Sequence, residues 1–319
     1  MGIERLTERQ VVGEFYKALK ADSGAGWINL VSNYFGSDQA SEEYAWLGQS
    51  PVLRRVIGGR NAKGLVESNM TITNVHFEST IKILTKILRR DKSGQAFLRI
   101  RELARRSKTH WASLLSTLIL NGASTDCYDD QYFFDTDHEE GDSGTQSNSI
   151  TVDISALPVA TAGTTALPSV AEFQFAIAQA IQAIVGFKDN VGEPMNEDAS
   201  QFAVMVPHQY MNVAMQAVTT KAQVAETQSA LEALQGEFGV KVVVNPRLTS
   251  WYSSYNFCVF RTDAEIKSFI CQEETGVNLA VKGYGSEYEF DNFAHQYGID
   301  TNRNVGYGYW QNSCLVTMS

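Results

Sequence analysis

The sequence predicts an α+β fold, and three patterns support that prediction. Apolar and polar residues alternate from Val75 to Ile83, which is typical of a strand with one face in water. A helical spacing of three and four follows over about residues 94–121. Strands then alternate with helices over residues 168–275, which predicts an α/β layer.

The first ninety residues predict an arm followed by a long hairpin. Residues 1–43 combine a short helical pattern with a stretch rich in Gly, Ser and Asn, so we expect an arm outside the compact core. In residues 44–90, an extended run at 51–57 and the strand from Val75 are separated by glycines, which predicts an extended hairpin loop. A two-stranded hairpin is marginal in water, so its partner surface is expected on a neighbouring subunit.

Residues 91–167 predict a region built on one long helix. Its apolar stripe, at spacings of three and four, consists of Phe97, Ile100, Ala104, Ser107, Trp111, Leu114 and Leu118. Asn121-Gly122 is a C-terminal stop signal. At 1.5 Å per residue the helix would be about 40 Å long. The remainder of this region predicts loop and short strands.

The second half of the chain predicts an α/β subdomain and a returning tail. Ser169 and Glu172 form an S-x-x-E capping box before an apolar helical stripe, which opens the α/β layer of residues 168–275. Residues 276–319 are rich in aromatic residues and Gly with little helical period. We therefore expect this tail to form strands that rejoin the earlier domain.

Composition and charge limit the classes of function. With 319 residues and 44% hydrophobic content, the chain can bury a core without disulfides or metals. It contains no apolar run of membrane-spanning length, and its first residues lack the pattern of a secretory signal, so synthesis and folding in the cytoplasm are expected. Its four cysteines are widely spaced, which predicts buried thiols and neither a disulfide framework nor a zinc knuckle.

The charge is unevenly distributed. The net charge of −10 argues against a chain that coats nucleic acid with its whole surface. Residues 82–108 nevertheless hold ten Lys or Arg and two acids, a local charge of +8. A predicted basic patch lies on the long helix and consists of Arg99, Arg101, Arg105, Arg106 and Lys108. Such a patch is suited to non-specific lining of a DNA-filled cavity, because it lacks interleaved aromatics and a recognition-helix arrangement.

The familiar catalytic motifs are absent from the sequence. There is no G-x-S-x-G, no phosphate-binding P-loop, no H-E-x-x-H, and Gly306-Tyr307-Gly308 lacks the third glycine of a dinucleotide-binding turn. The best candidate for a catalytic or metal-binding site is residues 133–140, an acidic run with one histidine. A metal-dependent hydrolase could use Asp135, Asp137 and His138 there. A solvated acidic loop or a subunit contact remains the alternative, and neither a catalytic residue nor a cofactor is assigned.

Three blocks of sequence carry a family resemblance. They are Tyr44 to Arg54 with Gly58-Gly59-Arg60, then Asn74 to Ile81, and then Leu120-Asn121-Gly122 with Cys127 to His138 and Asn148. In this order and spacing they resemble the major head subunit of Mu-like bacteriophages and prophages. Two features differ: Arg55-Val56-Ile57 stands where that family usually has a Trp, and the segment after Ile83 is unusually basic.

The resemblance implies a Hong-Kong-97-type phage capsid fold. Its parts would be an N-terminal arm (residues 1–43), an extended hairpin loop (44–90), a peripheral domain with a long spine helix (91–167), an axial domain (168–275), and strands that return to the peripheral domain (276–319). It implies pentamers and hexamers that form an icosahedral head around double-stranded DNA. Scaffolding, portal and decoration proteins are further implied partners, and the virion is the implied location. The expected contact residues of the hairpin are Trp46, Leu53, Arg54 and Arg60, with the alternative that Trp46 and Leu53 cap the local core. A protein-compartment shell of the same fold stays open as an alternative function.

Overall fold

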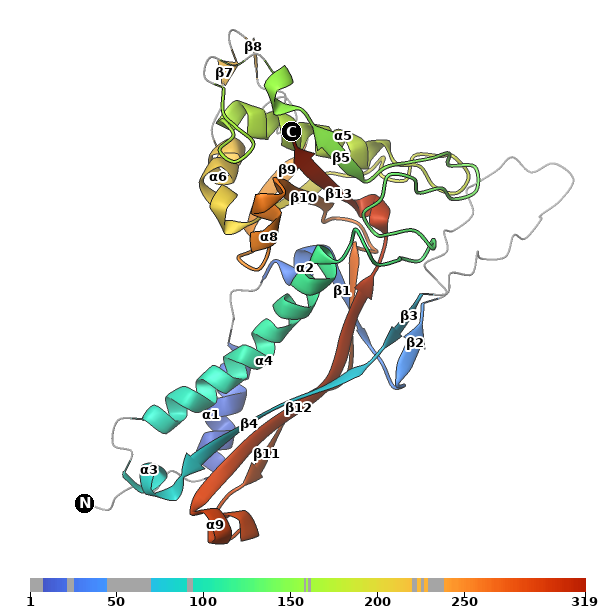
Figure 1. The fold of residues 1–319 in the computed structure, drawn as a ribbon. Coiled ribbons are helices and arrows are strands. Elements are labelled where there is room, and N and C mark those ends of the chain that lie inside the picture. The colour runs from blue at the N-terminus through green and yellow to red at the C-terminus, as the bar shows by residue number, and fades with distance from the viewer. Residues whose placement is uncertain are drawn as a thin grey trace, which may run out of the picture.

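The computed structural model describes residues 8–21, 26–44, 70–90, 94–157, 159, 162–219, 223–224, 227–228 and 238–319. Within them the chain forms a four-stranded sheet, a five-stranded sheet and two small strand pairs. Figure 1 shows the four-stranded sheet as a long extension and the five-stranded sheet in a wider body at one end of it. In these ranges no helix has both the length and the apolar character needed to cross a bilayer.

The four-stranded sheet carries the long helix. Its strand order is β1 (Ser32–Gly36), β11 (Phe269–Lys282), β12 (Ala294–Tyr307) and β4 (Val75–Leu84). β1 is parallel to β11, and the other pairs are antiparallel. The helices α4 (Gln95–Leu120) and α1 (Glu8–Lys20) run along this sheet (Figure 1), while α3 (Thr85–Arg90) and α9 (Glu287–Asn292) lie at its far end.

Alternating burial along β12 explains how the sheet holds the helices. Tyr297, Ile299, Thr301 and Arg303 are buried, and the residues between them are partly exposed. Because successive side chains of a strand point to opposite faces, these four share one face. Tyr297 and Ile299 pack in a core with apolar side chains of α1 and α4, namely Val11, Phe15, Ala96, Ile100, Leu103 and Ala104.

The prediction of the long helix agrees closely with the structure. It was expected over about residues 94–121 and spans Gln95–Leu120. The predicted stripe is buried from Ile100 to Trp111, but beyond it the buried positions are Leu115 and Ile119, while Leu114 and Leu118 are only partly buried. The stripe changes position because the two ends of the helix pack in different cores: the first half faces the four-stranded sheet, and the second half faces the core of the wider body.

The five-stranded sheet forms the centre of the wider body. Its order is β5 (Ser149–Val152), β13 (Ser313–Met318), β10 (Asn256–Arg261), β6 (Gln201–Val206) and β9 (Gly239–Val244). The helices α5 (Val170–Gly186), α6 (Met211–Thr219) and α8 (Thr249–Ser253) pack around it. The predicted capping box is confirmed: the Ser169 hydroxyl accepts from the Glu172 N–H, and the Glu172 carboxylate accepts from the Ser169 N–H at 2.7 Å.

Short elements complete the connections. They are α2 (Ile28–Val31), β2 (Ser41–Glu43), β3 (Thr71–Thr73), β7 (Gln223–Val224), β8 (Thr227–Gln228) and the 3-10 turns η2 (Ile154–Ala156), η3 (His208–Tyr210) and η4 (Trp310–Asn312). β2 and β3 pair in antiparallel register, Ser41 opposite Thr73 and Glu43 opposite Thr71. This pair lies on either side of residues 45–69 in the sequence.

The described part of the predicted arm packs into the body, so the arm prediction is wrong for residues 8–20 and 28–36. Val11 and Phe15 of α1 are 1% and 0% exposed against α4, and β1 pairs with β11. Burying an aromatic side chain such as Phe15 stabilises the fold by roughly 1.5–3 kcal/mol. The helical pattern in this segment therefore indicates packing against the body, in spite of the Gly- and Asn-rich residues that follow it.

The predicted hairpin needs a correction at its second strand. β4 has the predicted alternation, yet its partner among the described residues is β12, with Val75 opposite Arg303 and Leu84 opposite Ala294. β4 is therefore part of the four-stranded sheet. The other predicted strand, residues 51–57, lies outside the described residues.

The tail was expected to return to one domain, but it divides between the two sheets. β12 lies in the four-stranded sheet, whereas β13 enters the five-stranded sheet between β5 and β10. The prediction is therefore wrong for residues 313–318. The physical reason is that Cys314, Leu315 and Val316 are consecutive buried apolar residues, which suit a central strand covered on both faces. The same pairing places β5, expected in the peripheral domain, in the five-stranded sheet.

Candidate functional site

The hairpin contact residues that the sequence predicts cannot be placed. Trp46, Leu53, Arg54 and Arg60 all lie outside the described residues. Their contact role stays a prediction.

The predicted basic patch lies on the outer face of α4. Arg99, Arg101, Arg105 and Arg106 are exposed, and Lys108 is partly buried, with its ammonium group donating to the Ala21 carbonyl. Part of the charge is paired. Glu102 accepts from Arg99 and from Arg106 at 3.0 and 2.8 Å, and these contacts lower the pKa of its carboxyl, with Arg106 the larger cause. Arg101 lies 3.3 Å from the Glu14 carboxylate of α1. The patch is thus basic and solvent-facing, but less strongly charged than its five cations alone would make it.

A second surface feature lies at the far end of the long sheet. The turn between β11 and β12 presents three aromatic side chains to solvent: Tyr284, Phe290 and Phe293 are 79%, 83% and 75% exposed. We call these three residues the tip aromatics. Phe293 also has a positive φ of 50°, a conformation in which a bulky residue is rare. Large aromatic side chains that stay in water do not stabilise the isolated chain. Their exposure therefore indicates a surface that another molecule covers.

The tip itself is well held. The Ser286 hydroxyl caps α9 by accepting from the Glu289 N–H at 3.2 Å, and the Glu289 carboxylate lies 3.0 Å from Nε2 of His295. The carbonyl of Phe293 accepts from both the N–H and the hydroxyl of Thr85, each at 2.9 Å. Sequence reasoning missed this surface. The S-x-x-E sequence from Ser286 to Glu289 is a capping box pattern that could have revealed the helix.

The acidic loop places Asp135 and Asp137, which the hydrolase hypothesis combines with His138, on a different side from that histidine. Asp126, Asp130, Asp135 and Asp137 line a shallow hollow of about 420 Å³ together with Gln131 and Tyr132. The neighbouring Asp135, by hydrogen bonding and by its charge, raises the pKa of Asp137. His138, in contrast, is fully buried and its Nδ1 lies 2.7 Å from a carboxylate oxygen of Asp129. The histidine thus pairs with Asp129 rather than with Asp135 or Asp137, and no hydrolytic centre of the predicted kind is formed.

Beneath that hollow, the loop holds a buried polar cluster. The His138 ring stacks on the Trp310 ring with centroids 3.9 Å apart and an angle of 8° between planes. The Glu140 carboxylate accepts from the Trp310 indole N–H at 3.1 Å and from the Gln311 amide at 2.9 Å. It also accepts from the Tyr128 hydroxyl at 2.5 Å. Burial raises the pKa of Glu140, against the effect of these donors. The cluster fastens the loop after α4 to η4, at the passage between the two sheets.

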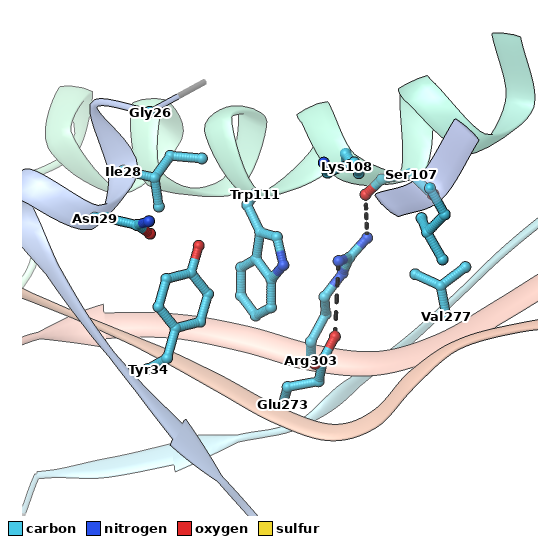
Figure 2. Close-up of a pocket in the computed structure, with 11 residues that line it drawn as sticks. Gly26, Ile28, Asn29, Tyr34, Ser107, Lys108, Trp111, Glu273, Val277 and Arg303 are labelled. Carbon is cyan, nitrogen blue, oxygen red and sulfur yellow. Dashed lines mark hydrogen bonds and ion pairs between the residues drawn. The ribbon is translucent and has the colours of Figure 1, made fainter. Parts of the chain in front are cut away.

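A cavity of about 400 Å³ lies between α4 and the four-stranded sheet. Figure 2 shows Arg303 of β12 reaching from the sheet to the helix. Arg303 is 2% exposed, its guanidinium lies 4.7 Å from the centroid of the Trp111 ring, and its Nη2 donates to the Ser107 carbonyl at 2.7 Å. The nearest carboxylate, that of Glu273, is 3.9 Å away, and burial lowers the pKa of Arg303.

Arg303 is therefore an anchor between helix and sheet. The period of two along β12 places it on the same face as Tyr297 and Ile299, so the strand pattern contained the signal that this arginine is buried. Of the other lining residues, Tyr34 packs edge-on to Trp111 with centroids 5.6 Å apart. The residues that line this cavity therefore make contacts that hold the helix α4 on the sheet.

The comparison with known families decides the relationship. Residues 7–158 match the family described as the Mu-like prophage major head subunit gpT. The chain is related to the major head subunits of Mu-like phages. The matched segment contains all three sequence blocks that suggested the resemblance, so the resemblance is confirmed.

Two curated Mu-like proteins agree with this result. The Mu-like prophage FluMu major head subunit of Haemophilus influenzae is 36% identical over 105 residues, which cover 33% of this chain and 34% of that protein. The major capsid protein of Escherichia phage Mu is 29% identical over 110 residues, 34% of this chain and 36% of that protein. These matches therefore span about a third of each relative's length.

The fold comparison covers more of the chain. The subunit of the procapsid of bacteriophage JBD30 superposes with a TM-score of 0.53 at 20% identity, over 98% of this chain and 77% of that one. At this identity the likeness concerns the fold. The chain has the α+β capsid fold of the Hong-Kong-97 type that the sequence predicted. In the terms of that fold, α4 is the spine helix.

Proposed function

We propose that this chain is the major capsid subunit of a Mu-like tailed phage. Its copies form pentamers and hexamers that close into an icosahedral head around double-stranded DNA, and assembly takes place in the cytoplasm of the bacterial host. The proposal is supported by the capsid fold, which extends over nearly the whole chain, and by the Mu-like match of its N-terminal part. Its role is structural, as the names of its relatives indicate.

The observation that carries self-assembly is the set of tip aromatics. Three large aromatic side chains, each at least 75% exposed, stand on a turn whose backbone is fixed by Thr85, Ser286 and Glu289. A rigid apolar projection loses little conformational entropy when a second copy covers it. Each weak contact is repeated around a closed shell, and closed symmetry makes such contacts cooperative.

The variant Phe290→Ser with Phe293→Asn tests this contact. Asn tolerates a positive φ better than Phe does, so the isolated subunit should retain its melting temperature. Burial of one Phe contributes roughly 1.5–3 kcal/mol, and about 1.4 kcal/mol corresponds to a tenfold change in an equilibrium constant. We expect the yield of closed shells, counted by negative-stain electron microscopy and gel filtration, to fall at least about tenfold.

The control is Glu287→Gln, which changes an exposed polar residue of the same helix and should leave the yield unchanged. Normal shells from the Phe290/Phe293 variant would show that the tip is not a subunit contact. If the unmodified chain stays solitary at high concentration, the capsid function itself is wrong. Shells that enclose protein instead of DNA would support the compartment alternative.

The predicted hairpin contacts belong to the same assembly. We propose that Trp46, Leu53, Arg54 and Arg60 contact a neighbouring subunit, because the sequence predicts an extended hairpin loop there and a two-stranded hairpin is marginal in water on its own. The pair β2–β3 supports this proposal, since it brings the two ends of residues 45–69 together in antiparallel register. Arg60→Glu and Trp46→Ala subunits that close into shells at normal yield would contradict it.

We further propose that the basic patch of α4 faces packaged DNA without reading its sequence. The exposed guanidinium groups of Arg105 and Arg106 support this role, and within the described residues Arg105 has no carboxylate partner. Each phosphate contact contributes about 0.9 to the slope of log affinity against log salt concentration. In Arg105→Gln with Arg106→Gln, we expect the slope measured on duplex DNA to fall by about 1.8.

Lys241→Gln removes an exposed cation from β9 and serves as the control, with an unchanged slope expected. An equal slope in the double variant and the unmodified chain would exclude the patch as the DNA-facing surface.

A further inference from the structure

The loop after α4 brings together three side chains of the kind that bind transition metals. Sγ of Cys127, a carboxylate oxygen of Asp129 and one ring nitrogen of His138 all lie within 4.8 Å of one another. Sγ is 2.9 Å from Oδ1 of Asp129, and Nδ1 of His138 is 2.7 Å from Oδ2. This set differs from the acidic run that the sequence suggested, because it takes the buried side of the loop and includes a thiol.

Local backbone contacts bring the three residues together. The Cys127 N–H donates to the Gln131 carbonyl at 2.7 Å, which closes a tight turn around Asp129. Isolated bridges pair Asp126 with Tyr132 and His138 with Gln146, so the loop folds back on itself twice. The segment from Asp129 to His138 is thus bent into one compact unit. A site on such a unit is preformed and needs no large movement to accept an ion.

The cluster is shielded from solvent and held in place. Cys127 is 5% exposed, and the side chains of Asp129 and His138 are 4% and 0% exposed. Parallel stacking on Trp310 fixes the plane of the His138 ring. A histidine with a fixed ring loses little freedom on binding a metal, and the supporting contacts of a metal ligand commonly decide its affinity.

The charge balance favours a cation. Asp129 is a buried carboxylate, and no Lys or Arg occurs in the sequence from Thr109 to Phe187. Among the described residues its ion-pair partner is His138, which supplies a positive charge only when protonated. The carboxylate also accepts from the Cys127 thiol and the Gln131 N–H, so the site holds a buried negative charge that a bound divalent ion would neutralise.

We propose that Cys127, Asp129 and His138 form a binding site for a divalent ion of the zinc class. A thiolate, an imidazole and a carboxylate together match the ligands of tetrahedral zinc, with a fourth position for water or a neighbouring group. At zinc–ligand distances of about 2.0–2.3 Å, the two hydrogen-bonded pairs, Cys127 with Asp129 and Asp129 with His138, must each move apart by roughly half an ångström. Binding replaces the thiol proton of Cys127, so one proton is released for each ion bound.

The position gives the ion a structural role. The three residues follow the C-terminus of the spine helix, and His138 stacks on η4, between β12 and β13. An ion there would tie the loop after α4 to the point where the chain passes into the five-stranded sheet. It would stabilise the folded subunit, because it binds a site that the unfolded chain lacks. This inference does not depend on the capsid function.

Cobalt titration of the full-length chain tests the proposal. Co²⁺ should bind with one ion per chain, produce a thiolate-to-cobalt charge-transfer band with the visible bands of a four-coordinate ion, and raise the thermal unfolding midpoint by several degrees. Zn²⁺ should abolish the bands by displacement. Cys127→Ser should lose the charge-transfer band, and Asp129→Asn should weaken binding at least about tenfold.

Cys271→Ala is the matched control, because Cys271 is also buried but lies in β11 outside the cluster, and its spectrum should be unchanged. If the unmodified, folded chain binds neither Co²⁺ nor Zn²⁺, the three residues form a hydrogen-bonded cluster only and the proposal is wrong. This measurement needs no variant, so it remains decisive if Cys127→Ser fails to fold. A charge-transfer band that persists in folded Cys127→Ser would also overturn the assignment.

Discussion

Trp310→Ala is expected to destabilise the subunit by about 3–5 kcal/mol, the usual cost of truncating a fully buried large aromatic residue. Trp310 is 0% exposed, stacks on His138 and packs edge-on against Phe187 with centroids 5.2 Å apart. Its indole N–H also donates to the Glu140 carboxylate. The substitution therefore leaves a cavity at the passage between the sheets and removes one donor from a buried carboxylate. The midpoint of urea unfolding, followed by circular dichroism, measures the loss.

Trp310→Phe separates packing from hydrogen bonding. The phenyl ring retains most of the stacking but has no N–H for Glu140, so we expect a cost of about 1–3 kcal/mol. Equal losses in the two variants would mean that the hydrogen bond dominates. A loss below about 1 kcal/mol for Trp310→Ala would contradict the view that this residue joins the loop to the core.

Gly308→Ala is expected to cost about 3 kcal/mol, at the upper end of the range for inserting one methyl group into a packed region. A Cβ at this position would collide with the backbone carbonyl of Lys267. The Gly308 N–H donates to the Ser268 carbonyl at 2.8 Å, so the two backbones are held together and cannot easily separate. Thermal or urea unfolding of the purified subunit measures this cost.

Gly306→Ala is the matched comparison, two residues earlier in the same segment. There the added methyl would meet the side chains of Ile72 and Met70, which can change rotamer. We expect a cost of about 1 kcal/mol for this variant. If Gly306→Ala proves as harmful as Gly308→Ala, close backbone approach is not what requires glycine at position 308.

The sequence predicted the helices best, because their signals are local. The stripe of α4 and the capping box of α5 each use residues within a few turns of one another, so their bounds could be predicted nearly to the residue. Strand partners were harder to predict. The alternation of β4 showed that it was a strand with one buried face, but nothing in residues 75–84 specifies β12 as the neighbour. Partner choice depends on contacts far apart in sequence, such as Val75 with Arg303.

The same difference applies to the candidate sites. The basic residues of α4 could be predicted as exposed, because the helical period assigns each residue a face. The pairing of His138 with Asp129 and Cys127 could not, because it depends on two loop bridges and on a tryptophan from the other end of the sequence. The tip aromatics lay in a segment whose many aromatic residues indicated strands, and their exposure depends on the turn between β11 and β12, which contains the six-residue helix α9.

The place of β13 has a consequence for how the protein is made. This strand follows every other strand in chain order, yet it lies between β5 and β10. A nascent chain on the ribosome therefore exposes two unpaired strand edges until residues 313–318 have been synthesised. Open edges of this kind pair readily with other chains. Completion of the five-stranded sheet thus waits for this strand, and a polypeptide terminated before residue 313 lacks the strand that would close the gap.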